Sequence, residues 1–182
     1  MSVQKTIRRE AGSIHENPVR LDIDKVEQIV EALSTDLANL YVLYHQLHKH
    51  HWNVEGAEHL TIHRWLQEAY EETEEMADEV AERIQSIGGV PPARMSALIA
   101  HASIEAEDED VYDIRTSLEH DIEMYGDIVE MYREHIEMVD TFGDYATGEI
   151  LRDQLVDLED HTHVIHHFLE EDTLVTEASI QG

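Results

Sequence analysis

The sequence contains no cysteine, and this absence excludes several kinds of chemistry at once. Without thiols, the 182-residue chain cannot build a disulfide framework, a zinc ribbon, a thiolate-bound iron–sulfur cluster or a cysteine nucleophile. It also lacks an apolar run of about 18 residues, the length that a transmembrane helix needs. Its first 18 residues lack the apolar core of a signal peptide, so we expect a cytoplasmic protein with no membrane partner.

Basic side chains are scarce: the chain has 12 Lys and Arg against 41 Asp and Glu, and its net charge is -29. Such a charge is often a sign of disorder, but 42% of the residues are apolar and recur at helical spacing, which indicates a folded protein. The acidic residues are spread over the whole chain, as on a charged surface. We interpret them as an adaptation to molar salt, where the Debye length is about 3 Å. An ordinary acidic cytosolic protein is the alternative.

The shortage of basic residues also bears on nucleic acids. DNA affinity depends on Lys and Arg that displace the condensed counterions of the phosphates. The main basic cluster is Lys5, Arg8 and Arg9, directly followed by Glu10. We therefore expect DNA binding to be weak or absent.

Apolar residues at spacings of three and four predict an all-α protein with four long helices, at about 22–52, 59–87, 110–139 and 145–170. Short links join the first helix to the second and the third to the fourth, which predicts two antiparallel hairpins. The link over 88–109 is long, with a short helix around 94–101, and one long crossover is typical of ferritin-like four-helix bundles. The predicted divisions are a flexible polar segment at 1–20, the bundle at 21–172 and a tail at 173–182.

The second predicted helix has a polar stripe opposite its apolar face, made of His63, Gln67, Glu74, Asp78 and Glu82. A solvated acidic surface is one explanation of this stripe. The first helix adds His51, which continues an apolar face and is by itself typical of a hydrogen-bonded core histidine. The combination of imidazole and carboxylate without thiolate is also what Fe(II) prefers, so a metal site is the second explanation.

Helix geometry restricts how such a site can be built. Asp78 follows His63 by fifteen residues, about 22 Å of helical rise, so the two side chains cannot bind one metal within one subunit. The chain also contains no Glu-x-x-His, the usual intrachain di-iron pattern of ferritin-like bundles. A single site would have to be shared across a twofold axis, with His51 and His63 from one subunit and Asp78 and Glu82 from its mate. It would therefore require an oligomer.

Three features together resemble the Dps family, the small ferritins that protect DNA in starved cells. They are the stretch His51-Trp52-Asn53-Val54-Glu55-Gly56, the position of His63 twelve residues after His51, and the acidic run over 72–84. The resemblance covers about 25–170, and the acidity and the histidine-rich fourth helix resemble the haloarchaeal branch. It implies a hollow dodecamer whose inter-subunit centres oxidise Fe(II) to Fe(III), with hydrogen peroxide or dioxygen, and which stores ferric mineral.

Within this resemblance, His51 and His63 match the histidine ligands of the family, and Asp78 and Glu82 match the carboxylates of the neighbouring subunit. Trp52 matches the aromatic residue beside the centre, where it would intercept radicals. Gln67 departs from the pattern, because the family usually has an aspartate there. A neutral amide is a poorer iron ligand, so this change weakens the second iron position.

Further residues are candidates for handling iron. Glu71, Glu74 and Glu75 either nucleate mineral on the inner wall or form a plain solvated face. His163 and His167, an i, i+4 pair, either chelate a metal or lie at a surface or interface. Two other functions stay open from the sequence: a different ferritin-like di-iron oxidase, and a non-catalytic helical bundle that binds DNA or a protein.

Overall fold

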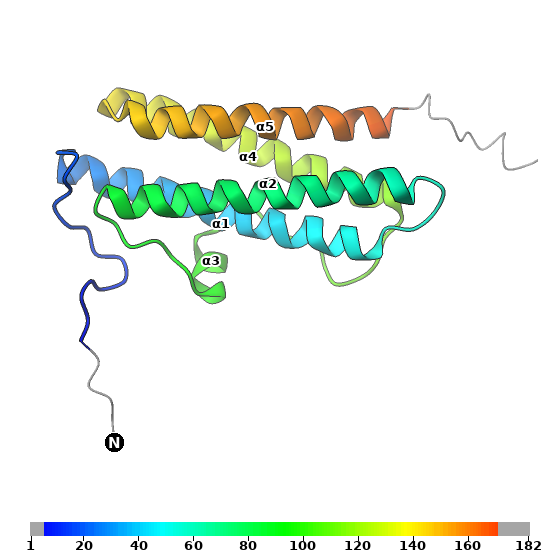
Figure 1. Ribbon diagram of the computed structural model, residues 1–182, viewed down its shortest axis with the longest axis horizontal. Coiled ribbons are helices and arrows are strands. Elements are labelled where there is room, and N and C mark those ends of the chain that lie inside the picture. The colour runs from blue at the N-terminus through cyan, green and yellow to red at the C-terminus, as the bar shows by residue number, and fades with distance from the viewer. Residues whose placement is uncertain (1–5, 171–182) are drawn as a thin grey trace, which may run out of the picture.

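The structure is a computed structural model and describes residues 6–170, in which the regular elements are five helices (Figure 1). They are α1 (Ile23–Asn53), α2 (His59–Ser86), α3 (Met95–His101), α4 (Ile114–Phe142) and α5 (Tyr145–Leu169). The four long helices lie side by side, and the short α3 packs outside them against α1. The predicted tail at 173–182 lies outside the described residues.

The connectivity is the one that the sequence predicted. Helices α1 and α2 form one hairpin, α4 and α5 form the other, and the chain crosses between them through α3 (Figure 1). The third long helix is displaced from its predicted range of 110–139, however. It begins only at Ile114, because the Asp113 side chain caps it by accepting the backbone N–H of Thr116. It ends at Phe142, where Gly143 adopts a left-handed conformation with φ of 79°.

Aspartates also start the first and last helices. Asp22 caps α1 by accepting the N–H of Asp24. Asp144 caps α5 by accepting the N–H of Thr147, and it also receives a hydrogen bond of 2.6 Å from Arg83 of α2. This buried carboxylate therefore starts one helix and ties it to the other hairpin.

The apolar faces of the long helices meet in one continuous core. Its fully buried side chains include Leu40, Leu43, Leu66, Tyr125 and Ile128. Charged side chains also pair between α1 and α4, where His135 Nδ1 lies 2.9 Å from a carboxylate oxygen of the fully buried Asp36. Burial raises the pKa of Asp36; burial alone would lower the pKa of His135, but the hydrogen bond and charge of Asp36 raise it.

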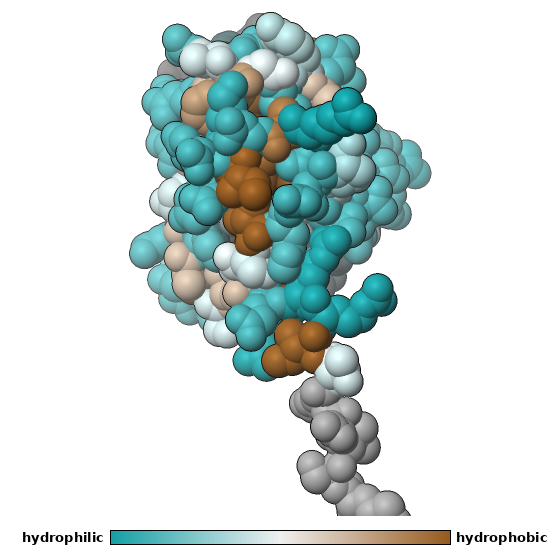
Figure 2. All heavy atoms as spheres, turned by 90° about the vertical axis from the view of Figure 1, so that its left-hand side faces the viewer, coloured by the Kyte–Doolittle hydropathy of each residue, from teal (hydrophilic) through white to brown (hydrophobic). Residues whose placement is uncertain are grey.

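Polar side chains dominate the surface. At the end of the bundle where α1 and α5 begin, hydrophilic residues surround a small apolar patch (Figure 2). Among the residues described, no helix is both long enough and apolar enough to cross a membrane.

Candidate metal centre

Two histidines meet where α1 ends and α2 begins. The rings of His51 and His63 stack with their centroids 3.8 Å apart and their planes 18° from parallel. Nδ1 of His51 lies 3.0 Å from the backbone oxygen of His63, and Nδ1 of His63 lies 3.0 Å from the backbone oxygen of His51. A carbonyl oxygen only accepts, so both Nδ1 atoms carry the proton. In the neutral form of each ring, Nε2 then keeps the lone pair that could bind a metal ion, and a backbone carbonyl commonly orients a metal-binding histidine in this way.

The carboxylates of the predicted site lie elsewhere on the chain. Asp78 and Glu82 are exposed and lie four to five turns further along α2 than His63. Within residues 6–170, no group of three or more His, Asp or Glu side chains is placed to hold a metal ion. The structure thus brings His51 and His63 together and leaves Asp78 and Glu82 free to meet another molecule.

Aromatic rings cluster beside the histidine pair. The ring of Tyr70 packs edge-on against His51 at 5.2 Å between centroids, and His48 lies 3.8 Å from Tyr70. Trp52 stacks on His48 at 5.1 Å and is 69% exposed. Within one chain, Tyr70 therefore contacts His51 directly, whereas Trp52 is linked to the pair through His48. Burial and the neighbouring charges of His51 and His45 lower the pKa of His48, which favours a neutral ring.

Gln67 lies one turn beyond His63 on the same face of α2. Its amide nitrogen donates to a carboxylate oxygen of Glu71 at 2.8 Å, which leaves the neutral amide oxygen as its remaining acceptor. Glu71, Glu74 and Glu75 are exposed on the same helix. Among residues 6–170, no hydrogen bond or ion pair involves the side chain of Glu74 or Glu75, so both carboxylates can receive cations from solution.

The histidines near the end of α5 form a separate group. His163 and His167 are exposed, and their Nε2 atoms are 3.0 Å apart. This spacing suits either one N–H donated between the rings or two lone pairs directed at one cation. The next histidine, His166, pairs instead with Glu170 at 3.0 Å.

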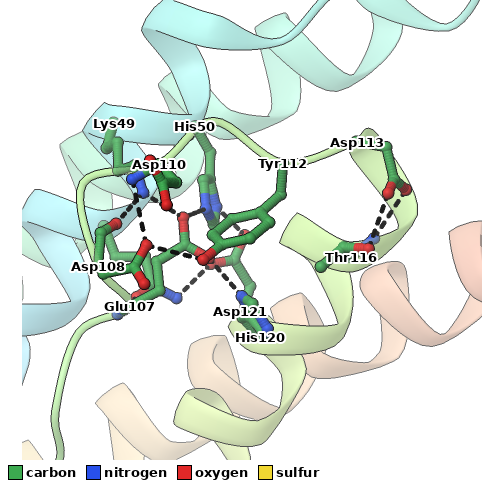
Figure 3. Close-up of polar contacts among 11 residues, drawn as sticks. Lys49, His50, Glu107, Asp108, Asp110, Tyr112, Asp113, Thr116, His120 and Asp121 are labelled. Carbon is green, nitrogen blue, oxygen red and sulfur yellow. Dashed lines mark hydrogen bonds and ion pairs between the residues drawn. The ribbon is translucent and has the colours of Figure 1, made fainter.

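A buried polar network that the sequence did not predict lies on the other side of α1 (Figure 3). His50 lies between two acids: its Nε2 is 2.7 Å from Glu107, and its Nδ1 is 2.9 Å from Asp121. Since carboxylates only accept, both nitrogens donate and the ring is a cation. Burial alone would lower the pKa of His50, but the hydrogen bonds and charges of Asp121 and Glu107 raise it.

Further donors complete this network. Lys49 donates to Glu107 at 2.6 Å, Gln46 donates to Asp121 at 3.0 Å, and His120 also pairs with Glu107. Together these contacts fasten the crossover segment to the last turns of α1, directly beside His51. No sequence pattern predicted this network, because His50 is 57 and 71 residues away from its two acidic partners.

The chain is similar to known proteins in both sequence and structure. A family model described as a ferritin-like domain matches residues 30–175. A DNA protection during starvation protein of Halobacterium salinarum is 56% identical over 182 residues, all of both chains. The crystal structure of an archaeal Dps homologue from that organism matches with a TM-score of 0.92 and 56% identity, covering 97% of this chain and 98% of that one. The Dps protein of Vibrio cholerae, described as a ferritin-like diiron-carboxylate protein, matches with a TM-score of 0.81 and 26% identity, over 87% of this chain and 99% of that one.

Proposed function

Since the chain belongs to the Dps family of ferritin-like proteins, we propose that it detoxifies and stores iron. Its substrate is Fe(II), which it oxidises at centres shared between subunits. The ferric product is kept as mineral inside a hollow shell of twelve subunits. We place this activity in the cytoplasm, where Fe(II) and hydrogen peroxide would otherwise damage the cell.

The observation that carries this proposal is the reciprocal hydrogen bonding of His51 and His63. It leaves the Nε2 atom of each ring available to a metal ion when the ring is neutral, and imidazole is a good ligand for Fe(II). Asp78 and Glu82 of the partner subunit complete the centre with hard oxygen ligands, which hold Fe(III) more strongly than Fe(II) and so favour the oxidised product. The exposure of both carboxylates in the single chain is consistent with a place at an interface.

Hydrogen peroxide is the proposed oxidant, with dioxygen as the alternative. Two Fe(II) ions and two protons reduce one peroxide to two waters and give two Fe(III) ions. Because the peroxide receives both electrons in this reaction, no hydroxyl radical leaves the protein. The protein's own role is to position metal and oxidant, and no protein nucleophile is needed.

The proposal is tested by adding Fe(II) to iron-free protein in high KCl, with and without stoichiometric peroxide. We expect ferric absorbance to rise faster than in protein-free buffer, and faster with peroxide than with dioxygen. Size-exclusion chromatography should then show iron eluting with a particle of about twelve subunits. Oxidation no faster than in buffer, or a monomer that elutes without iron, would contradict the proposal.

Several relatives are named for protecting or binding DNA, and we propose that this chain protects DNA by removing iron and peroxide. The net charge of -29 supports this view, because it opposes association with phosphates. We expect the assembled protein to leave linear DNA unretarded in a gel, even at low salt, where any electrostatic attraction is strongest. A clear shift of the DNA would show that the charge argument is wrong.

A further inference from the structure

The sulfur of Met131, on α4, has hydrogen-bond donors as neighbours. The amide nitrogen of Asn39, on α1, lies 3.4 Å from this sulfur, and Oγ of Ser103, in the crossover after α3, lies 3.9 Å from it. Met138, seven residues further along the same helix, packs instead against the apolar core. Met131 is therefore held by polar groups from two other parts of the chain.

The backbone of the crossover fixes the orientation of the Asn39 amide. Asn39 is fully buried, and its side-chain oxygen accepts the backbone N–H groups of Ser103 at 2.9 Å and Ile104 at 3.4 Å. Because these groups only donate, the NH₂ end of the amide is the end that faces Met131. One amide hydrogen reaches Oγ of Ser103 at 3.0 Å, which leaves the sulfur as the acceptor for the other. A thioether is a weak acceptor, so this buried N–H is poorly satisfied.

The sulfur is also placed where a small solute can reach it. Met131 is only partly buried and lines an open groove of about 260 Å³. The other residues of this groove are Ser103, Ile104, Asp127, Glu130 and Glu134. Its three carboxylates oppose the entry of anionic oxidants, but they do not oppose hydrogen peroxide, which is a neutral molecule.

We propose that Met131 is a modification site that hydrogen peroxide oxidises to the sulfoxide, and that Asn39 and Ser103 hold the sulfoxide oxygen. The sulfur attacks one oxygen of the peroxide, an S–O bond forms and the O–O bond breaks. The other oxygen leaves as water and takes both protons. The methionine loses two electrons and the peroxide gains them, so the step needs neither a metal nor a radical.

The polar surroundings reverse the usual effect of methionine oxidation on a fold. A sulfoxide in an apolar core disrupts packing, because it is polar. At Met131 the new oxygen gives the buried N–H of Asn39 a stronger acceptor than the thioether, and the hydroxyl of Ser103 is close enough to donate as well. Oxidation therefore tightens the contact of α4 with α1 and with the crossover, and it consumes peroxide independently of the proposed iron centre.

The first test treats the assembled, iron-free protein with hydrogen peroxide in high KCl that contains a metal chelator. Peptide mass spectrometry then measures the oxidation of each methionine, with Met95, which is 54% exposed, as the internal reference. Because the donors hold the sulfur in one orientation, we expect one sulfoxide epimer at Met131 to exceed the other at least about fivefold. Met95 should give both epimers in similar amounts. The two classes of methionine sulfoxide reductase, each specific for one epimer, distinguish them in the isolated peptides.

Thermal unfolding, at fixed protein and KCl concentrations, is the second readout. Met131→Leu is the matched control, because it keeps every other methionine available for oxidation. Relative to this variant treated in the same way, oxidation should raise the unfolding midpoint of the unmodified protein by about 2–4 °C.

Three results would each overturn the inference. If Met95 is oxidised and Met131 is not, peroxide does not reach the groove in the assembled protein. Equal amounts of the two epimers at Met131 would show that the sulfur is not held, and a midpoint that does not rise would show that the sulfoxide oxygen is not bound. None of these measurements involves iron, so the proposed function is tested separately.

Discussion

Particles reassembled from a mixture of His63→Ala and Asp78→Ala chains are expected to oxidise Fe(II), although neither variant does so alone. Each variant lacks a ligand in every shared centre, so each should lose at least about tenfold in rate. In a mixed twofold dimer, one centre carries both lesions and the other carries none. Random pairing makes about half of the dimers mixed, so about a quarter of the centres should be intact. The initial rate of ferric absorbance, measured after dissociation and reassembly, should recover to about that fraction of the normal rate.

A mixture of His51→Ala and His63→Ala provides the matched control. Both lesions lie in the half of the centre that one chain supplies, so every mixed dimer has two damaged centres and no recovery is expected. Equal activity in the two mixtures would show that the gain does not come from sharing. Confirmed reassembly of His63→Ala with Asp78→Ala without any recovery would count against a shared centre altogether.

Asp121→Ala is expected to lower the free energy of unfolding by about 3–5 kcal/mol, because it removes one partner from a buried network of charges. Asp121 is fully buried and accepts hydrogen bonds from both His50 and Gln46. Its loss leaves the His50 cation with Glu107 alone and leaves the amide of Gln46 without this acceptor. Urea unfolding at fixed KCl and fixed protein concentration measures the change, since assembly makes the apparent stability depend on concentration.

Asp127→Ala is the matched control for this prediction. Asp127 is an exposed aspartate on the same helix, less than two turns away, and its replacement should change the stability by no more than about 0.5 kcal/mol. If both variants unfold at the same urea concentration, the network around His50 does not stabilise the fold.

The fold was predictable because its signals are local. The spacing of the apolar residues predicted all four long helices, and the Gly88-Gly89-Val90-Pro91-Pro92 stretch marked the start of the crossover. The misplaced start of α4 has a simple origin: apolar Val111 fits the helical spacing, but Asp113 caps the helix, which therefore begins at Ile114, three residues after Val111. A capping side chain competes with hydrophobic periodicity over a single turn, and here the cap prevails.

The candidate site was predictable only in part. The resemblance identified His51 and His63, but their mutual hydrogen bonds depend on how the five residues between α1 and α2 fold back. Tyr70, which contacts His51, follows His63 by seven residues and so lies on the same face of α2. A search for polar side chains does not detect this tyrosine. The acidic partners of His50 carried no sequence signal. A pair between a histidine and a distant carboxylate leaves no pattern in a chain with 41 acidic residues.

The stacked histidines also determine what it costs to bind a metal there. A free histidine loses rotamer freedom on coordination, and each side chain that must be ordered on binding costs about 0.5–1.5 kcal/mol. His51 and His63 have already lost that freedom, because each ring is held by the backbone of the other before any metal arrives. The entropy cost of ordering both rings is therefore already part of the folding free energy of the α1–α2 hairpin, and we expect a metal at the proposed centre to bind the pair without ordering it first.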